Sequence, residues 1–445
     1  MGADCAASYA NNQVAMKIVL NLSEYNNGAS NRLFINAVIG YLSWGIVAVF
    51  LLFLPFQFRI YKSFDLPHIF LWGDEVFCIV AFLAFYIILI YTGHLKKDIA
   101  QIIVVLFIIA SIGIISGLLN NNNFVITTQG IFSYIKNFMF IPIFGLFRIN
   151  KRRYRRLYNL LHQIALLLCF VGIFQEILYL FGVPLKGEVR FGILRVASLM
   201  GHTNEFGLYS LLFFILDYSL EKKFRWQNIV FSIGVLISCS RMVWVAYFLS
   251  YIYLLFHIEK KKLIIYFVIL ICILGVAFPT FYKISRRDYM DPENNYRGYC
   301  LAKALEICKD HPILGVGPGM FGGEISVVFN SPVYQKYDFS ERWYEYGLAK
   351  FHSLDQFWAQ LIGEIGLLGL LAFVLLLVLL WRKTKKASIL SEDQFKSNIL
   401  LGYSAIPIVL MVYLYGSGLN IGSFLITYSV LFGMCLGIKD ENFTD

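Results

Sequence analysis

The sequence predicts an all-α polytopic membrane protein with about twelve transmembrane helices, one broken hairpin and one large extracytoplasmic loop. Its 445 residues are 58% hydrophobic and only 15% charged, whereas about a quarter of residues are charged in soluble proteins. Uncharged apolar runs of about 18 residues or more recur, each long enough to cross a bilayer as a helix. The net charge of +10 comes from short basic clusters between these runs, a pattern typical of cytoplasmic loops rather than of nucleic-acid binding.

The apolar runs define most of the predicted spans in chain order. We place these spans at residues 33–55, 72–92, 99–119, 124–147, 159–183, 205–220, 263–281, 354–381, 398–416 and 419–438. The basic clusters between them occupy residues 94–98, 148–159, 221–228, 257–262 and 381–386. The positive-inside rule assigns all of these clusters to the cytoplasm. The terminal segments 1–32 and 439–445 are then cytoplasmic as well.

The run from residue 228 to residue 256 conflicts with this scheme, because basic clusters flank it on both sides. Its 29 residues contain one charge, Arg241, and as a single helix they would span about 43 Å, enough for one crossing and too short for two. We therefore expect a broken hairpin of two short helices that meet at "SCSR" (238–241), within the membrane or at its outer edge. Irregular backbone is tolerated there only beside protein or a water-filled cavity.

These spans divide the chain into a first membrane part (33–281), a large extracytoplasmic loop (282–353) and a last membrane part (354–438). The loop carries nine Lys/Arg and nine Asp/Glu, which is typical of a folded polar segment. An enzyme that works at the outer face needs such a loop, whereas a transporter rarely does. We also find no internal repeat of one half in the other, which weakens the transporter alternative.

The large loop contains a predicted helix followed by a glycine-rich run. An asparagine at position 294 or 295 can cap a helix that runs to about Lys309. We expect its apolar side to contain Leu301, Leu305 and Cys308, with Arg297 at the start of the same stripe.

The glycine-rich run follows the end of this helix and includes Gly315 and Gly317. Glycine at this density lets backbone N–H groups approach a phosphate closely, which makes these positions candidates for substrate binding. A loop with a purely structural role is the alternative.

The end of the large loop, "KFHSLDQFW", offers a candidate general base. Ser353 and Gln356 match a capping box, so we expect a helix to start at Ser353. The positive end of that helix would keep the preceding His352 neutral and able to accept a proton. Asp355 could orient the imidazole. A histidine at the membrane interface without a catalytic role is the alternative.

A third polar group, Arg190, Arg195, His202 and Asn204, lies between two predicted spans. Arginines next to a membrane commonly only anchor to lipid headgroups. Arg241 is different, because an unpaired arginine at membrane depth costs from about 3 to more than about 10 kcal/mol.

Arg241 therefore needs an anionic partner, which is either a membrane carboxylate, Asp217 or Glu176, or a ligand. The planar guanidinium fork binds pairs of phosphate oxygens and keeps its charge. We therefore expect Arg241, Arg297 and either Arg190 or Arg195 to converge on a diphosphate.

Four motifs in this order give the chain a family resemblance. They are "MGHTN" (200–204), "SCSR" (238–241), "RGYCLAKALEI" with "HPILGVGPGMF" (297–321), and "HSLDQFW" with "EIGLLG" (352–369). Over about residues 185–375 the chain resembles the O-antigen polymerase and O-antigen ligase superfamily. Two arginines and one histidine of the ligase site correspond to Arg241, Arg297 and His352. The family often has asparagine directly after the histidine, where this chain has Ser353.

The resemblance implies a helical fold of the GT-C type and an active site at the periplasmic or outer face of the bacterial cytoplasmic membrane. It also implies glycosyl transfer from an undecaprenyl-diphosphate-linked oligosaccharide without a metal or other cofactor. Within the family we favour a polymerase that extends a surface polysaccharide by repeat units, with a chain-length regulator and a flippase of the same pathway as further partners.

Three alternatives remain open. One is an O-antigen ligase that transfers the glycan to lipid A–core or protein, and another is a transporter of lipid-linked oligosaccharides. The third is a metal-dependent transferase. Candidate metal ligands gather in or beside the first outer loop, at Asp65, His68, Asp74 and Glu75, and two more, Asp288 and Asp291, lie in the large loop.

Overall fold

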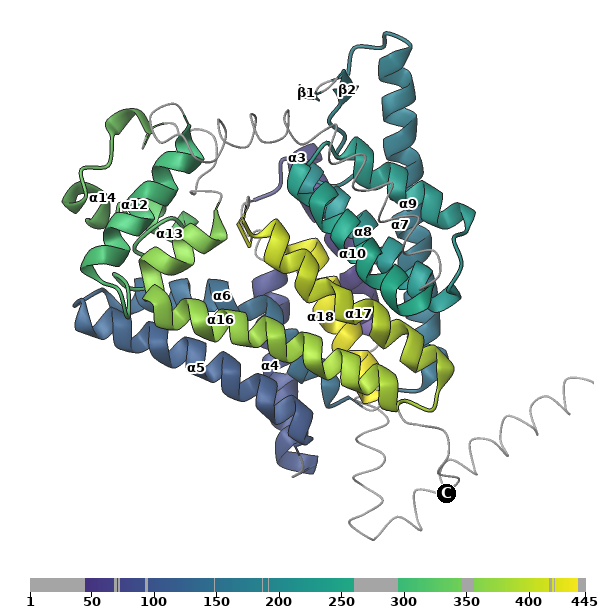
Figure 1. The fold of residues 1–445 in the computed structure, drawn as a ribbon, viewed down its shortest axis with the longest axis horizontal. Coiled ribbons are helices and arrows are strands. Elements are labelled where there is room, and N and C mark those ends of the chain that lie inside the picture. The colour runs from purple at the N-terminus through teal and green to yellow at the C-terminus, as the bar shows by residue number, and fades with distance from the viewer. Residues whose placement is uncertain are drawn as a thin grey trace, which may run out of the picture.

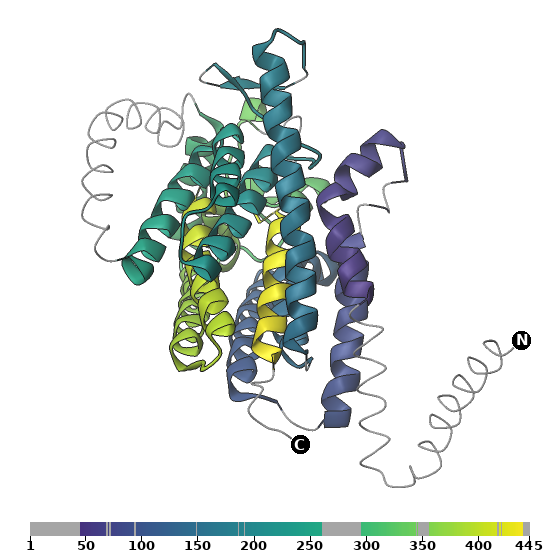
Figure 2. The same cartoon turned by 90° about the vertical axis from the view of Figure 1, so that its right-hand side faces the viewer.

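The computed structural model describes residues 45–67, 70, 73–92, 95–147, 149–185, 187–190, 192–259, 295–343, 345, 356–415, 418–419 and 421–438. These residues are almost entirely helical (Figures 1 and 2), which confirms the all-α class. The predicted span 263–281, both terminal segments, His352 and Asp355 lie outside the described residues.

Six helices within the described residues are long and apolar enough to cross a membrane. They are Gly45–Ser63, α5 (Lys97–Leu119), α7 (Lys151–Leu180), α10 (Arg241–Ile258), α16 (Phe357–Leu390) and α17 (Gln394–Tyr413). The first of them contains a 3-10 turn, η1 (Leu54–Phe56), and ends in α3 (Gln57–Ser63). The other helices of the bundle are α4 (Gly73–Thr92), α6 (Phe124–Gly145), α8 (Thr203–Glu221), α9 (Trp226–Ile237) and α18 (Gly422–Gly437). The chain is thus a multi-pass membrane protein.

Helix α18 lies at the centre of the bundle, where α6, α8 and α17 pack around it. Figure 2 shows it running beside α7 through the middle of the molecule. Nearly all of its side chains are buried, including Phe424, Tyr428 and Phe432. A helix that is apolar on all sides needs such surroundings, so α18 anchors the helices that carry the polar residues described below.

The broken hairpin predicted for residues 228–256 is present. Helix α9 ends at Ile237, α10 begins at Arg241, and Cys239 between them has a positive φ of 48°. The Trp244 Nε1–H donates to the carbonyl oxygens of Val235 (3.1 Å) and Leu236 (3.2 Å). This bond satisfies carbonyl groups that the end of a helix leaves without a partner, so the break is stabilised from α10 itself.

Three of the predicted cytoplasmic clusters share one end of the bundle. Lys383 pairs with Asp98, which joins the cluster 381–386 to 94–98. Lys96 also donates to the carbonyl oxygen of Leu436 (3.2 Å), and in cluster 148–159 the backbone of Ile149 pairs with that of Ile438. Because α5, α7 and α17 start at or next to these clusters, their other ends lie at the opposite end of the bundle.

That opposite end carries the described part of the large loop. Helix α12 (Tyr296–Asp310), α13 (Glu324–Val328) and α14 (Val333–Lys336) gather over the start of α16 (Figure 1). Asn295 caps α12 by accepting the Arg297 N–H at 2.9 Å, as predicted. The predicted apolar side is wrong, however, because Leu305 is 49% exposed and the buried face consists of Tyr296, Gly298, Cys300, Ala304 and Ile307.

The predicted helix start at Ser353 is also wrong. Gln356 lies in extended backbone, with φ −144° and ψ 101°, and is the N-cap residue of α16, which begins at Phe357. A capping box needs its fourth residue inside the first helical turn. Gln356 instead faces a cavity that is described below.

Candidate functional site

The first polar cluster, which we call the arginine cluster, consists of Arg190, Arg195 and Arg297 together with the turn before Arg241. Arg190 ends strand β1 (Val189–Arg190), which pairs with β2 (Ile193–Leu194) in a short hairpin between α7 and α8. Arg190 donates to both carboxylate oxygens of Glu188 (2.7 and 3.1 Å). Arg195 donates to Glu188 (3.0 Å) and to the side-chain oxygen of Asn204 (2.8 Å). Arg190, Arg195 and Glu188 together carry one net positive charge.

The pKa shifts of Glu188 and Arg195 indicate which charged groups lie near this hairpin. Partial burial of Glu188 favours its neutral form and would raise its pKa. The hydrogen bonds and charges of Arg190 and Arg195 outweigh this effect, so the pKa of Glu188 is lowered. Burial lowers the pKa of Arg195, and the positive charges of Arg190 and Arg297 lower it further. The start of α12 therefore lies within electrostatic reach of Arg195.

The turn of the broken hairpin belongs to the same region. Cys239, two residues before Arg241, lies within electrostatic reach of Glu176, Arg195 and Arg190. Of the two carboxylates considered as partners for Arg241, Glu176 lies within electrostatic reach of this turn, and an ion pair with it remains an alternative to a ligand. Asp217 accepts from Asn228 (2.9 Å) and lies 3.2 Å from His162, and Glu176 accepts the Leu194 N–H at 3.3 Å. The structure thus brings three arginine-bearing segments together.

His202 faces a different place. It is exposed at the N-cap of α8, and its ring lies 5.0 Å from that of Phe58. It lines a small cavity of about 150 Å³ together with Gln57, Asp74, Glu205 and Ser423. Asn204 therefore contacts Arg195, while His202 lies against a different set of residues.

The glycine-rich run packs tightly against helices of the bundle. Gly315 and Gly317 have positive φ values of 66° and 105°, and a Cβ on Gly315 would approach the Glu364 backbone to 2.5 Å. The N–H groups of Val316 and Gly317 donate to the carbonyl oxygens of Gly363 (2.9 Å) and Glu364 (2.8 Å). These contacts support the structural role for the run, and contact of Gly315 and Gly317 with a substrate stays a prediction.

Glu364 is a buried residue that sequence reasoning did not assign to any role. Its carboxylate accepts from the Tyr134 hydroxyl (2.5 Å) on α6 and from the Phe321 N–H (3.0 Å) of the glycine-rich run. It is fully buried on α16 two residues before Gly366, whose φ of 66° kinks the helix. A buried carboxylate in an apolar helix usually has a specific polar partner. Through its hydrogen bond to Phe321, Glu364 positions the glycine-rich run on α16.

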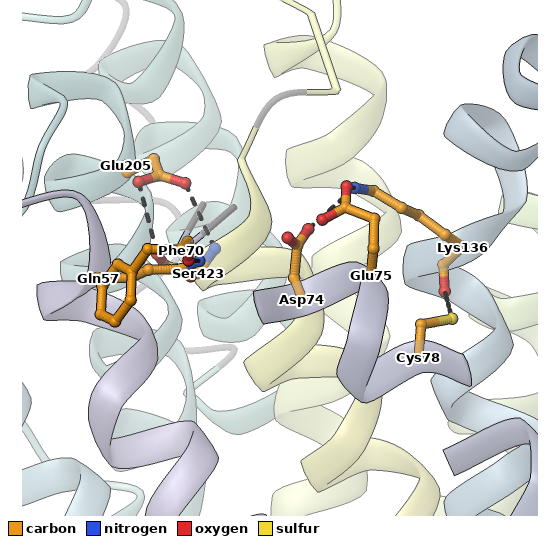
Figure 3. Close-up of polar contacts among 8 residues, drawn as sticks. All are labelled: Gln57, Phe70, Asp74, Glu75, Cys78, Lys136, Glu205 and Ser423. Carbon is orange, nitrogen blue, oxygen red and sulfur yellow. Dashed lines mark hydrogen bonds and ion pairs between the residues drawn. The ribbon is translucent and has the colours of Figure 1, made fainter. Parts of the chain in front are cut away.

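Lys136 is the second residue that sequence reasoning missed. It is the only charge between residues 124 and 147, the same signal that singles out Arg241. Figure 3 shows its ammonium group reaching from α6 to two carboxylates on α4, Asp74 (2.9 Å) and Glu75. In the same view Glu205 on α8 accepts from Ser423 at the start of α18. Polar groups from four helices therefore meet inside the bundle.

Two of the acidic residues considered as metal ligands, Asp74 and Glu75, are paired with a lysine, whereas His68, Asp288 and Asp291 lie outside the described residues. Asp74 and Glu75 both hold Lys136, a cation that occupies the place a metal ion would take between them. In the described part of the chain, no three histidine, cysteine or acidic side chains gather in a way that could hold a metal ion.

The fold and these clusters define a polytopic helical membrane protein with its functional polar groups at one end of the bundle. Residues 228–374 match the protein-family model described as O-antigen ligase. The match lies within the part of the chain, about residues 185–375, that resembles the O-antigen polymerase and ligase superfamily. The matched range includes Arg241, Arg297 and His352. No curated protein matches the chain.

Proposed function

We propose that this protein is the polymerase of a bacterial surface polysaccharide, either O-antigen, capsule or exopolysaccharide. It transfers the growing glycan from undecaprenyl diphosphate to the terminal sugar of another lipid-linked repeat unit. The observation that carries the proposal is the convergence of three separate segments with Arg195, Arg297 and the turn before Arg241 inside a chain with this family domain. Arginine side chains gathered in one region favour the binding of an anionic substrate group there.

The arginines suit the leaving group of this reaction. When the glycosidic bond breaks, negative charge grows on the diphosphate, and Arg241 and Arg297 compensate it without a metal ion. Both keep their charge at any physiological pH. Groups that are already oriented toward developing charge contribute about 10²–10³-fold in rate each.

The acceptor hydroxyl is a poor nucleophile, and we assign its deprotonation to His352, with Asp355 to orient the ring. A positioned general base contributes about 10²–10⁴-fold. Direct attack by the hydroxyl on the anomeric carbon breaks the bond to the diphosphate oxygen and inverts the anomeric centre. Both residues lie in the part of the loop just before Gln356, the N-cap of α16.

The proposal places the reaction at the periplasmic or outer face of the bacterial cytoplasmic membrane. The arginine cluster lies at the end of the bundle away from the basic clusters, which the positive-inside rule assigns to the cytoplasm. The large loop at 282–353 then faces outward between the membrane parts 33–281 and 354–438. A flippase and a chain-length regulator of the same pathway are the partners this topology requires.

Complementation of a deletion strain tests the proposal. His352→Ala, Arg241→Ala and Arg297→Ala are expected to abolish long-chain surface glycan and leave single-repeat caps. Arg342→Ala is a matched control, because Arg342 lies in the same loop but stacks on Trp343, 4.7 Å from the ring centre. Normal long-chain glycan in all three variants would refute the assignment.

The products also separate the alternatives. If the protein is a ligase, its loss would leave unlinked polymer on the lipid diphosphate, because the acceptor of a ligase is lipid A–core or protein. If it is a transporter, its loss would leave the lipid-linked repeat unit on the cytoplasmic face. Single-repeat caps on the surface are expected only when transport and ligation both proceed and polymerisation fails.

A further inference from the structure

A second polar site lies apart from the arginine cluster. It is a cavity of about 440 Å³ between α6, α13, the start of α4 and the start of α16, closed on one side by Gly418 and Leu419. This volume falls in the range of about 300–1,000 Å³ that small-molecule sites occupy. The cavity opens at the same end of the bundle as the large loop, since Gly319, Gly323 and Glu324 line it.

Carboxamide side chains dominate the polar part of this cavity. Its lining includes Gln129, Asn137, Gln356 and Gln360. Three aromatic rings, those of Phe132, Tyr134 and Phe357, also line it. A carboxamide offers two N–H donors and a carbonyl acceptor in one plane, and it can therefore bind neighbouring hydroxyl groups that both donate and accept.

Two of these carboxamides keep an unused acceptor. The side-chain oxygens of Gln356 and Asn137 are buried and have no hydrogen-bond partner among the described residues. The two residues are only 4% and 3% exposed, so bulk water does not hydrate them. Buried polar atoms in folded proteins nearly always have a partner, so these two carboxamides are polar groups of the cavity wall that the described protein atoms do not fully satisfy.

The charges around the cavity exclude a diphosphate as that ligand. Glu75, Glu324 and Lys136 line it, and Asp74 and Glu75 neutralise the ammonium group of Lys136. The described residues of the lining therefore offer a diphosphate no cation that lacks a carboxylate partner, in contrast to the net positive arginine cluster. The ligand that fits is therefore neutral and polyhydroxylated.

We propose that this cavity binds a neutral sugar of the glycan, and specifically the acceptor end that the reaction extends. This inference rests on the proposed function for the identity of the glycan as acceptor, while sugar binding itself rests only on the cavity. The assignment to the acceptor rests on Gln356, the N-cap of α16, which follows the proposed base His352 by four residues in the sequence.

The experiment measures sugar binding by the purified full chain in detergent micelles. Saturation-transfer NMR is recorded with methyl glycosides of glucose, galactose, rhamnose and N-acetylglucosamine at millimolar concentration. Ser133→Phe places a ring in the cavity, and Ser133→Ala is its matched control, since Ser133 lines the cavity on α6. Gln129→Ala is a milder variant of an exposed side chain in the same lining, with an expected loss of affinity of about tenfold for one strong hydrogen bond.

The proposal expects at least one glycoside to bind the wild type and the Ser133→Ala variant, and to lose its signal in Ser133→Phe. Wild-type protein that binds none of the glycosides would overturn it. So would equal binding by the wild type, Ser133→Phe and Gln129→Ala. Arg297→Ala is measured in parallel and is expected to bind the glycoside normally. If Arg297→Ala still makes long-chain glycan in cells while Ser133→Phe has lost glycoside binding, the proposed function fails and the sugar site stands.

Discussion

The arginine cluster and the carboxamide cavity lie at the same end of the bundle but differ in every electrostatic respect. Arginine side chains dominate the first, and Arg195 is within reach of the charge of Arg297. Neutral carboxamides, aromatic rings and a lysine held by two carboxylates line the second. A lipid-linked glycan has the same division, an anionic diphosphate and a neutral sugar chain. Under the proposed function, the first cluster would face the leaving diphosphate of the donor and the second the neutral sugar of the acceptor.

Loss of the arginines that face the diphosphate should give the largest effect. We expect Arg241→Ala or Arg297→Ala to lower the rate of chain extension by about 10²–10³-fold, because each removes a fixed cation from the developing charge. The measurement is elongation of purified lipid-linked repeat units by the solubilised enzyme. Arg→Lys at the same positions should recover part of the rate, since the charge remains and the bidentate geometry is lost.

This prediction also tests whether the two clusters act separately. The arginine variants should leave methyl glycoside binding unchanged. A loss of glycoside binding in Arg297→Ala as large as that in Ser133→Phe would show that the two clusters form one site, and the comparison would then fail.

Lys136 should matter most for stability. We expect Lys136→Met to lower the free energy of unfolding by about 3–5 kcal/mol, because it leaves Asp74 and Glu75 partly buried without their cation. Thermal unfolding in detergent measures this loss. The triple variant with Asp74→Asn and Glu75→Gln should recover much of it, since no unpaired charge then remains. If Lys136→Met alone were as stable as the wild type, water would already screen the carboxylates of Asp74 and Glu75.

Glu364 should have an intermediate effect, through the position of the glycine-rich run. Glu364→Ala leaves the Tyr134 hydroxyl and the Phe321 N–H without their acceptor, and we expect a cost of about 1–3 kcal/mol. Glu364→Gln keeps an acceptor oxygen and should cost less. Equal stability of the two variants in thermal unfolding would contradict the role of the carboxylate as a hydrogen-bond acceptor.

Sequence reasoning succeeded where a single residue departs from its surroundings. Arg241 interrupts an apolar run too short for two crossings, so both the charge and the break at 238–240 were predictable. Lys136 carries the same signal and could have been found in the same way. Its partners could not, because Asp74 and Glu75 are about sixty residues away and only the packing of α4 on α6 brings them close.

The errors have a common physical cause, which is tertiary packing. The periodicity of α12 allows two apolar stripes, and the one that is buried contains Cys300, Ala304 and Ile307 because Tyr334 and Tyr337 belong to the same small core. The capping pattern at Ser353 and Gln356 is locally plausible, but Gln356 instead lies before α16 and lines the cavity. The cavity itself combines carboxamide, aromatic and charged residues from five segments, and no spacing in the sequence marks it.

The smallest effect is expected at the exposed edge of the arginine cluster, and it should depend on pH. Arg190→Ala should lower the free energy of unfolding by less than about 1 kcal/mol at neutral pH, because Glu188 is 53% exposed and surface pairs contribute little. Since Arg190 and Arg195 lower the pKa of Glu188 in the folded state, their contribution is present above the unfolded pKa of about 4.3. It is lost as the pH falls through the folded value. Thermal unfolding of the wild type and Arg190→Ala should therefore differ slightly at pH 7 and converge below about pH 4, and a difference that grows on acidification would contradict the pairing with Glu188.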